Sequence, residues 1–581
     1  MGDIHLIIEE RVREVTGELL GAQFHAIDPL VRPTAEGRFG DYQADLAMGL
    51  AKQLGRSPRD IAQPIAEQLS QDPIFECVSV AGPGFINFRL SQATLGDLAQ
   101  DLLSDERLGV ALVDPPRTIV VDYSSPNVAK EMHVGHLRST VIGDTLVRVL
   151  RFLGHTLIPQ NHVGDWGTQF GMLIQHMLDT GARAGGEYRV NDLNVLYQAA
   201  KRRFDEDGRF AEAARERVLK LQEGETETRA LWRELVAESV RHFAEVYERL
   251  EIPLTPQDIR GESSYNADLP VVIAELEQLG LAHESQGALV VYPPGFKDRQ
   301  GEPLPMIVRK ADGGYLYATT DLAAARYRVN VLGADRLIYV TDARQKDHFA
   351  MLFAVLRETG WAPEDVMLNH IAFGSVLGKD RKPFKTREGG TIRLVDLIDE
   401  AERRAAGILR EKDPDLAVEE REKIAHVLGI GALKYADLCN DRIKDYVFDW
   451  DRMLAMDGNT APYLQNAYVR ICSIFRRAGL DPDAYVIEHI RVQDPLERRL
   501  LLCLLRFPHT IGLVAERLEP HLLGNYLYEL AGEFHHFYER CPVLGASSEL
   551  LRKQRLALCQ LVARTLKRGL ELLGIGVVER M

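Results

Sequence analysis

Two histidines three positions apart stand at the start of a predicted helix. His133 and His136 lie in the string His-Val-Gly-His, after a strand-like apolar run at 118–123 and before a helix-like run at 137–153. A helix N-terminus offers unpaired N–H groups and the positive end of the helix dipole, which attract phosphate. Histidines at this spacing share one helical face, so both can donate hydrogen bonds to phosphate oxygens as charge develops there. Gly135 lacks a Cβ and lets a ribose or purine approach the backbone. The pattern predicts a site for a nucleoside triphosphate.

The histidines belong to a longer string at 124–139, Ser-Ser-Pro-Asn-Val-Ala-Lys-Glu-Met-His-Val-Gly-His-Leu-Arg-Ser. This string resembles the first signature of the class I aminoacyl-tRNA synthetases, in the version carried by the arginyl-tRNA synthetases. The resemblance implies that His133 and His136 are catalytic and that ATP binds here, with Mg²⁺ on its phosphates. No dedicated metal site is visible in the sequence. Asp165 and Gln169, in the string Asp-Trp-Gly-Thr-Gln, are expected to border the adenosine.

Three lysines are candidates for neutralising the pyrophosphate as it leaves. The loop 374–390 takes the place of the family's second signature and keeps two of its lysine positions, Lys382 and Lys385, with Thr386 in place of the final serine. Lys130, within the first signature, can reach the same phosphates. Arginyl family members with an altered second signature are thought to use a lysine at this place. The resemblance therefore makes Lys130 the first candidate and Lys385 the second.

An arginine substrate requires carboxylates in bidentate geometry and flat aromatic walls. Tyr317 and Asp321 lie four residues apart and share a face if the segment is helical. An aspartate at a helix start is more often an N-cap, and Thr320 or Asp321 is the expected cap of a helix at 321–331. The string resembles the Tyr-x-x-x-Asp of the arginyl family, which implies that Tyr317 and Asp321 bind arginine. The resemblance implies the same for three more residues: Asn127 at the α-amino end, Gln345, and Glu262 as a second carboxylate.

Composition limits the class of protein. With 581 residues, 46% of them hydrophobic and 27% charged, the chain is long enough for three or four globular domains. No apolar run reaches the ~18–20 residues that span a bilayer, and the N-terminus does not resemble a signal peptide. The six cysteines form no Cys-x-x-Cys pair, which favours free thiols in a reducing compartment. We therefore expect a cytoplasmic protein. The net charge of −15 argues against indiscriminate coating of nucleic acid.

The order of predicted elements indicates a multidomain α/β protein. Residues 1–110 predict a small α+β domain, with helices at 3–20, 43–54 and 57–69 and two strands around a Gly-Pro-Gly turn at 78–90. Apolar runs predict strands at 118–123, 155–161, 288–292, 306–309, 337–341 and 366–373. They alternate with helices over 111–391, which predicts a Rossmann-type parallel sheet interrupted by a helical insertion at about 175–260. Residues 392–581 predict an all-helical bundle, with breaks at Pro414, Gly458, Pro482, Pro495, Gly524 and Gly545.

Both outer domains resemble parts of the arginyl family that bind tRNA. The N-terminal block is similar to the family's additional domain, which is implicated in contacting the tRNA elbow, although a purely stabilising role is equally compatible. The string at 457–470 resembles the start of the anticodon-binding bundle, where stacking surfaces and positive charge suit splayed bases. The implied tRNA contacts are Tyr463, Gln465, Arg470 and Tyr538. Further aromatic side chains of the bundle could also stack on bases or belong to its core: Tyr526, Tyr528, Phe534, His535 and Phe537.

The resemblance covers essentially the whole chain and identifies it as a member of the arginyl-tRNA synthetases, of bacterial type and monomeric. The activity it implies is ATP-dependent ligation of L-arginine to tRNA(Arg) through an arginyl-adenylate, releasing AMP and pyrophosphate. One alternative is a synthetase-like protein that binds tRNA without activating an amino acid. Another is a class I synthetase for a different amino acid, or a nucleotidyltransferase that shares the fold.

Overall fold

The chain divides into two compact units in a computed structural model. The structure describes residues 3–34, 37–181, 190–384, 392–482, 485–487 and 490–581, with the side chains of 190–192 excepted. One unit contains residues 1–112 and 455–581, and the other contains residues 113–454. The first helices after residue 392 therefore fall in the unit of the parallel sheet, whereas the sequence boundary had grouped them with the helical tail. No described helix combines the length and the apolarity that crossing a membrane requires.

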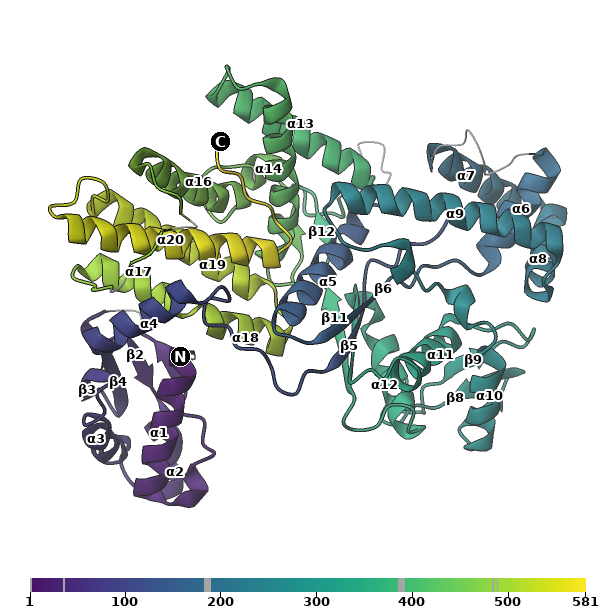
Figure 1. Cartoon of the computed structure of the whole chain (residues 1–581). Helices are drawn as coiled ribbons and strands as arrows, with labels where there is room; N and C mark the ends of the chain where they lie inside the picture. The colour runs from purple at the N-terminus through teal and green to yellow at the C-terminus, as the bar shows by residue number, and fades with distance from the viewer. Residues whose placement is uncertain (1–2, 35–36, 182–189, 385–391, 483–484, 488–489) are drawn as a thin grey trace. The chain divides into compact units, whose positions relative to one another are not determined.

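The N-terminal domain packs helices against a four-stranded antiparallel sheet of order β1-β2-β4-β3 (Figure 1). Helix α1 buries Ile4, Ile8 and Val12, which recur on one face of the helix. The predicted helix at 43–54 begins later, because residues 42–44 pair with β4 instead. The elements are α1 Ile4–Leu20, β1 Val31–Pro33, β2 Tyr42–Ala44, α2 Leu46–Leu54, α3 Pro58–Leu69, β3 Phe75–Ala81, β4 Phe85–Leu90 and α4 Gln92–Ser104.

A four-stranded parallel sheet of order β11-β10-β5-β6 forms the centre of the second unit. Its strands are β5 Thr118–Asp122, β6 Thr156–Gln160, β10 Arg336–Asp342 and β11 Met367–Phe373, joined by helices α5 Val134–Phe152, α11 Tyr317–Asn330 and α12 Lys346–Glu358. The central strands β5 and β10 are mostly buried, as expected for a parallel sheet covered by helices, whereas the edge strands β6 and β11 are mostly half-buried. The Rossmann-type sheet predicted from the alternation is confirmed.

Two insertions separate the halves of the parallel sheet. The first is helical and comprises α6 Thr168–Thr180, α7 Val190–Glu206, α8 Gly208–Glu223 and the long α9 Thr226–Arg249, which gather together in Figure 1. The second contains α10 Leu269–Gln278 and the antiparallel sheet β7 Ala282–Ser285, β8 Ala288–Val291 and β9 Met306–Arg309. The strands predicted near 288 and 306 therefore exist but do not join the parallel sheet.

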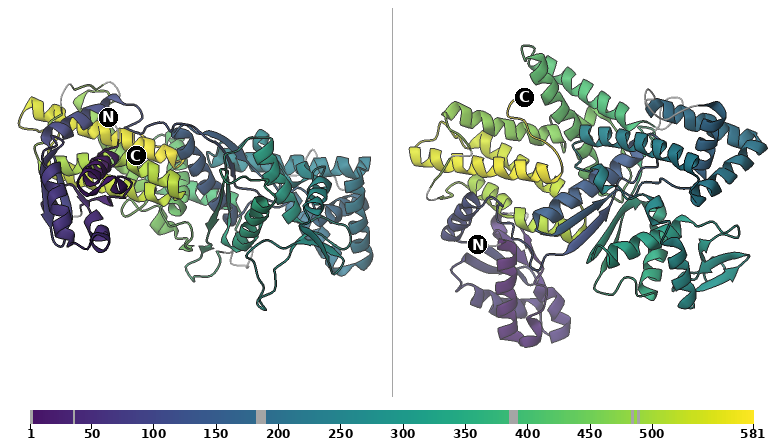
Figure 2. Two further views of the ribbon diagram at one scale, coloured as in Figure 1. Left: turned by 90° about the horizontal axis from the view of Figure 1, so that it is seen from below. Right: turned by 45° about the vertical axis from the view of Figure 1, so that its right-hand side comes forward.

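The C-terminal third is almost entirely helical. In the second unit lie α13 Leu394–Lys412, α14 Val418–Leu438 and α15 Trp450–Met453, with the short strands β12 Val376–Leu377 and β13 Tyr446–Val447. The bundle of the first unit comprises α16 Ala461–Ala478, α17 Pro495–Leu505, α18 Phe507–Arg517, α19 His521–Arg540 and α20 Glu549–Leu572 (Figure 2). The break predicted at Gly524 is wrong, because this glycine is buried inside α19.

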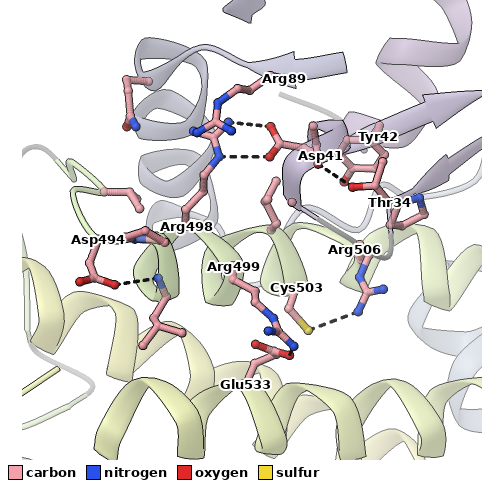
Figure 3. A pocket seen from close by; sticks show the side chains of 18 of the residues that line it. Thr34, Asp41, Tyr42, Arg89, Asp494, Arg498, Arg499, Cys503, Arg506 and Glu533 are labelled. Carbon is pink, nitrogen blue, oxygen red and sulfur yellow. Dashed lines mark hydrogen bonds and ion pairs between the residues drawn. The ribbon is translucent and has the colours of Figure 1, made fainter. Parts of the chain in front are cut away.

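Within the first unit, the N-terminal domain and the bundle line a common cavity of about 610 Å³ (Figure 3). The bundle's Arg498 reaches across and bonds to Asp41 and to the carbonyl of Leu90. Arg499, in contrast, bonds to Glu533 within the bundle. The first and last parts of the chain are thus joined by buried polar contacts.

Candidate active site

The predicted site residues gather at the carboxyl ends of the parallel strands. Segments that follow β5, β6 and β10 carry Asn127, Asp165 and Gln345 respectively. The first two segments pair with each other, since Val128 donates to the carbonyl of Gly164 and Gly164 donates to the carbonyl of Pro126. Ligands of open α/β sheets bind at this edge. The topology therefore explains why residues distant in sequence meet here.

His133 and His136 form a reciprocal cap at the start of α5. The Nδ1 atom of His133 accepts a hydrogen bond from the amide of Gly135 at 3.0 Å, and Nδ1 of His136 accepts one from the amide of His133 at 3.0 Å. The ring centroids are 4.0 Å apart. A Cβ on Gly135 would lie 2.8 Å from the His133 ring. Glycine here therefore keeps space for the imidazole as well as for a ligand.

The caps determine the protonation of both rings. Because each Nδ1 accepts a backbone N–H, the ring proton resides on Nε2, where it is available to a ligand. Burial lowers the pKa of His136 to about 3, with further lowering from His133 and Lys130. Burial and then Lys130 lower the pKa of His133. Both rings are neutral donors at neutral pH.

The lysine candidates differ in their surroundings. Lys130 lies close enough to both histidines to affect their pKa values, and its Nζ lies 4.9 Å from the ring centroid of Tyr197 in α7. Lys382 is exposed on a hairpin in which the amide of Gly378 donates to the Lys382 carbonyl at 2.8 Å. Lys385 lies outside the described residues. Lys130 is thus the lysine that the structure brings closest to the histidines among the described candidates.

Asp321 and Tyr317 share a face at the start of α11, and His348 of α12 contacts both. Its Nε2 lies 2.7 Å from Oδ2 of Asp321, and its ring lies edge-on to Tyr317 at 4.9 Å. The other Asp321 oxygen is 3.9 Å from Nε2 of His162. The cap prediction is wrong: α11 begins at Tyr317 after the N-cap Leu316, so Asp321 lies inside the helix.

Glu262 lies beside this group of carboxylates. Burial, followed by repulsion from Asp321 and Asp165, raises the pKa of Glu262 to about 7. Like charges crowded at one place disfavour ionisation until a cation arrives. The three acidic side chains therefore form a site whose electrostatics favour a cationic ligand.

Asp165 is bonded to the segment that follows Glu262. Its Oδ1 accepts from the amide of Ser263 at 2.8 Å and its Oδ2 from the Ser263 hydroxyl at 2.6 Å, and the side chain is buried. Both oxygens are engaged by the segment next to Glu262. Asp165 therefore holds the segment that contains Glu262, and its place at the border of the adenosine site stays a prediction.

The remaining predicted residues lie at the mouth of the site. Asn127 is exposed, and its side chain approaches Gly164 so closely that a Cβ on Gly164 would lie 2.4 Å from the Asn127 Oδ1 atom. Gln345 is exposed and caps α12. Gln169 is half-buried, and its amide lies 3.4 Å from the carbonyl of Gly164.

His162 and His348 were not predicted to act. His162 lies two positions after the end of β6, and His348 lies three positions after Gln345. Their position near the ends of a strand and a helix was the only sequence signal that they belong to the site. Their shared approach to Asp321 depends on tertiary packing that spacing does not show.

Metal binding by protein side chains alone is not supported. In the described ranges, no group of three or more His, Cys, Asp or Glu side chains is arranged to hold an ion. A divalent cation would therefore depend on oxygens of a bound nucleotide.

A second candidate surface lies on the bundle, over α16 and the end of α19. Arg470 lies over the ring of Tyr538 at 5.4 Å, and both line a cavity of about 660 Å³. The hydroxyl of Tyr463 bonds to His535 at 2.8 Å, and its ring lies 5.5 Å from that of Tyr528. This arrangement combines positive charge with aromatic surface, as unpaired bases require.

Several aromatic and polar candidates of the bundle belong to its core instead. Tyr526, Phe534 and Phe537 are buried. Gln465 is 0% exposed, and its amide donates to the carbonyl of Gly576. The predicted direct tRNA contact of Gln465 is corrected to a role in holding the C-terminal segment.

Three family profiles match the chain in the order of its domains. "Arginyl tRNA synthetase N terminal domain" matches residues 4–90, "tRNA synthetases class I (R), catalytic domain" matches 97–450, and "DALR anticodon binding domain" matches 464–581. The catalytic profile alone covers more than half of the chain. The chain belongs to the arginyl-tRNA synthetases. This family of class I enzymes joins arginine to tRNA(Arg).

Relatives and solved structures agree with this family over the full length. The arginine–tRNA ligase of Escherichia coli (strain SMS-3-5 / SECEC) is 50% identical over 580 residues, covering 100% of both chains. The arginyl-tRNA synthetase of Plasmodium falciparum superposes with a TM-score of 0.87 at 31% identity, covering 100% of both chains. That of Thermus thermophilus has a TM-score of 0.82 at 26% identity, covering 99% of this chain and 100% of that one.

Proposed function

We propose that this chain activates L-arginine with ATP at the carboxyl edge of the parallel sheet and transfers it to tRNA(Arg). The observation that carries the proposal is the group of carboxylates around Asp321, together with the reciprocal histidine cap of α5 on the same unit of the chain. The carboxylates bind the guanidinium of arginine, and the histidine cap binds the triphosphate of ATP. The arginine carboxylate attacks the α-phosphate in line, and the protein positions the two reactants.

In the arginine site, Asp321 and Glu262 bind the guanidinium while Tyr317 forms an aromatic wall. Tyr317 is 62% exposed, so its ring is accessible to a ligand. Asn127 and Gln345 hold the amino-acid end. Binding a cation lowers the electrostatic cost of ionised Glu262, whose pKa its neighbours raise. Selectivity for arginine follows from the pairing of its guanidinium with the carboxylates of Asp321 and Glu262.

In the ATP site, His133 and His136 donate from Nε2 to the phosphate oxygens, and Gly135 allows close approach of the nucleoside. Gln169 borders the adenosine. Lys130, Lys382 and Lys385 neutralise pyrophosphate as it departs. Mg²⁺ accompanies ATP on the phosphate oxygens, where it supplies additional positive charge.

The bundle surface receives the anticodon, with Tyr463, Arg470 and Tyr538 as contacts. The N-terminal domain contacts another part of the tRNA. The chain acts as a monomer in the cytoplasm, where its three substrates occur. Light scattering of the purified chain tests the monomer, since a mass twice that of the 65.3 kDa chain would contradict it.

The decisive experiment measures arginine-dependent ATP–pyrophosphate exchange with tRNA present, for the unaltered chain and for Asp321→Asn. Loss of one partner of a partly buried charge pair costs a few kcal/mol, so kcat/KM for arginine should fall by roughly 10²-fold. The KM for ATP should change little. An equal loss of ATP affinity would make Asp321 structural.

A panel of labelled amino acids separates the alternatives. Charging by arginine alone supports the proposal, whereas charging by another amino acid would retain the class and overturn the pocket. Binding of tRNA without charging by any amino acid would favour a tRNA-binding protein. The intact histidine cap and the carboxylate group support the active enzyme.

A further inference from the structure

A short segment at 442–448, which we call the bracket, contacts both the signature helix α5 and the lysine hairpin at 377–384. It follows α14 and contains the strand β13. All of these elements belong to the unit of residues 113–454. The bracket therefore connects two parts of the ATP site that are far apart in sequence.

Arg138 makes the contact on the side of α5. It lies two residues after His136 and is 1% exposed. Its Nη1 donates to the carbonyl of Lys444 at 3.1 Å, and its Nη2 donates to the carbonyl of Arg442 at 3.2 Å. Its Nε lies 2.9 Å from Oδ2 of the buried Asp437 of α14. Two nitrogens of the planar guanidinium thus hold the bracket backbone, and the third faces Asp437.

Aromatic rings complete the environment of this guanidinium. The Arg138 Cζ atom lies 5.2 Å from the ring centroid of Tyr446 and 5.8 Å from that of Phe373. Phe373 ends β11, and Tyr446 belongs to the bracket. The contact is therefore enclosed, and its geometry is strongly constrained.

The other side of the bracket contacts the segment that leads into the lysine hairpin. The amide of Gly374 donates to the carbonyl of Arg442 at 2.9 Å, which is the same carbonyl that Arg138 contacts. The amide of Ser375 donates to Oδ1 of Asp445 at 2.6 Å. A Cβ on Gly374 would lie 2.7 Å from that Asp445 oxygen. Hairpin and bracket are therefore in tight contact.

The hairpin itself is then fixed by the bracket. The amide of Phe448 donates to the carbonyl of Leu377 at 2.8 Å. The rings of Phe384 and Phe448 stack at 4.6 Å. The Nζ of Lys379 lies 3.1 Å from Asp449. These contacts determine where Lys382 stands.

We propose that Arg138 is a positioning residue for adenylate formation, because it sets the register between the histidine cap of α5 and the lysine hairpin. The proposal rests on the assignment of these elements to ATP under the proposed function. The transition state needs donors on the α-phosphate and positive charge on the departing pyrophosphate at the same time. A displacement of about 1 Å between such groups can cost about 10²-fold in rate.

The test uses Arg138→Lys in the full chain. A lysine retains the charge facing Asp437 but cannot hold two carbonyls in a planar fork. Arg336→Lys is the matched control, because Arg336 is also buried and bonds to Asn369, but stands at the amino end of β10. The readouts are arginine-dependent ATP–pyrophosphate exchange with tRNA, the Kd of an arginyl-sulfamoyl-adenosine analogue, and hydrogen exchange of residues 374–384.

We expect Arg138→Lys to lower kcat of exchange roughly 10²-fold, to leave the analogue Kd within about twofold, and to speed hydrogen exchange at 374–384. The analogue lacks pyrophosphate and so does not need the lysines. Arg336→Lys should leave all three readouts close to those of the unaltered chain. A parallel loss of analogue binding, or unchanged turnover, would overturn the proposal.

The outcome also separates this proposal from the proposed function. If the unaltered chain shows no exchange with arginine, the proposed function fails. In that case amide hydrogen exchange alone tests whether Arg138 holds the hairpin. Faster hydrogen exchange at 374–384 in Arg138→Lys, with β5 still protected, supports this role. Unchanged protection there would contradict it whatever the substrate.

Discussion

Arg498 and Asp41, 457 residues apart in the chain, form a buried bidentate ion pair. Nη2 of the arginine lies 2.6 Å from Oδ2 of the aspartate, and Nε lies 3.1 Å from Oδ1. The same aspartate accepts the amide of Leu90, whose carbonyl accepts from Arg498. One cluster therefore joins the last part of the N-terminal sheet to α17 (Figure 3).

Replacement of this arginine should loosen the N-terminal domain. Arg498→Met leaves Asp41 buried without its partner, which typically costs about 3–5 kcal/mol. We expect the amide of Leu90 to exchange hydrogen much faster. Arg499→Met is the control, because it removes the partner of the buried Glu533 within the bundle and leaves the Asp41 cluster intact. Equal hydrogen exchange of the Leu90 amide in the two variants would show that the Arg498–Asp41 ion pair does not hold the N-terminal domain.

His136 should act through its Nε2 proton and not only through its cap. His136→Asn keeps an acceptor near the position of Nδ1 but has no donor at Nε2, so kcat should fall by roughly 10²–10³-fold. His136→Gln places an amide donor closer to Nε2 and should retain more activity. Single-turnover adenylate formation measures both. The reverse order of activities would assign His136 to capping of α5 alone.

Arginine affinity should depend on pH through Glu262. The pKa of this carboxyl is about 7 in the free protein, so below that pH it is protonated and must lose its proton to bind a guanidinium. The KM for arginine should therefore rise as the pH falls from 8 to 6, and binding near pH 7 should release protons. Calorimetry in two buffers of different ionisation enthalpy measures that release.

Glu262→Gln provides the control for this pH effect. It removes the titrating group, so it should weaken arginine binding at pH 8 and flatten the dependence between pH 6 and 8. An unchanged slope in this variant would assign the titration to another group.

The bundle cavity should affect tRNA without affecting the small substrates. Tyr538→Leu removes a stacking surface worth about 1–3 kcal/mol per base, so the KM for tRNA should rise roughly 5- to 150-fold. Arg517→Met, at an exposed position of α18 outside that cavity, is the control. Exchange rates measured at saturating tRNA should be unchanged. A rise in the KM for arginine instead would place the effect in the folding of the bundle.

Most strands, most helices and the place of the two histidines at a helix start could be predicted because each depends on local pattern. The run at 118–123 and the His-Val-Gly-His string sit within a few residues of the features that they predict. The parallel sheet also followed, since alternating strands and helices leave few topologies.

The failures involve contacts between distant segments. The bond between Asp165 and Ser263 was not foreseen, because the two residues lie 98 positions apart. The strands near 288 and 306 pair with each other, and strand pattern does not reveal the partner. Gly524 resembled a break because glycine costs about 1 kcal/mol in a helix, but packing of the buried α19 outweighs that cost. Such outcomes depend on tertiary packing that short-range pattern does not contain.

The link between Asp41 and Arg498 also has a consequence for synthesis on the ribosome. At ~5–20 residues per second, the 457 positions between them take roughly 20 to 90 seconds to translate. For most of that time the N-terminal domain is complete, but the helix that binds it does not yet exist. Asp41 and the edge beside it must therefore remain soluble without their partner while the rest of the enzyme is made.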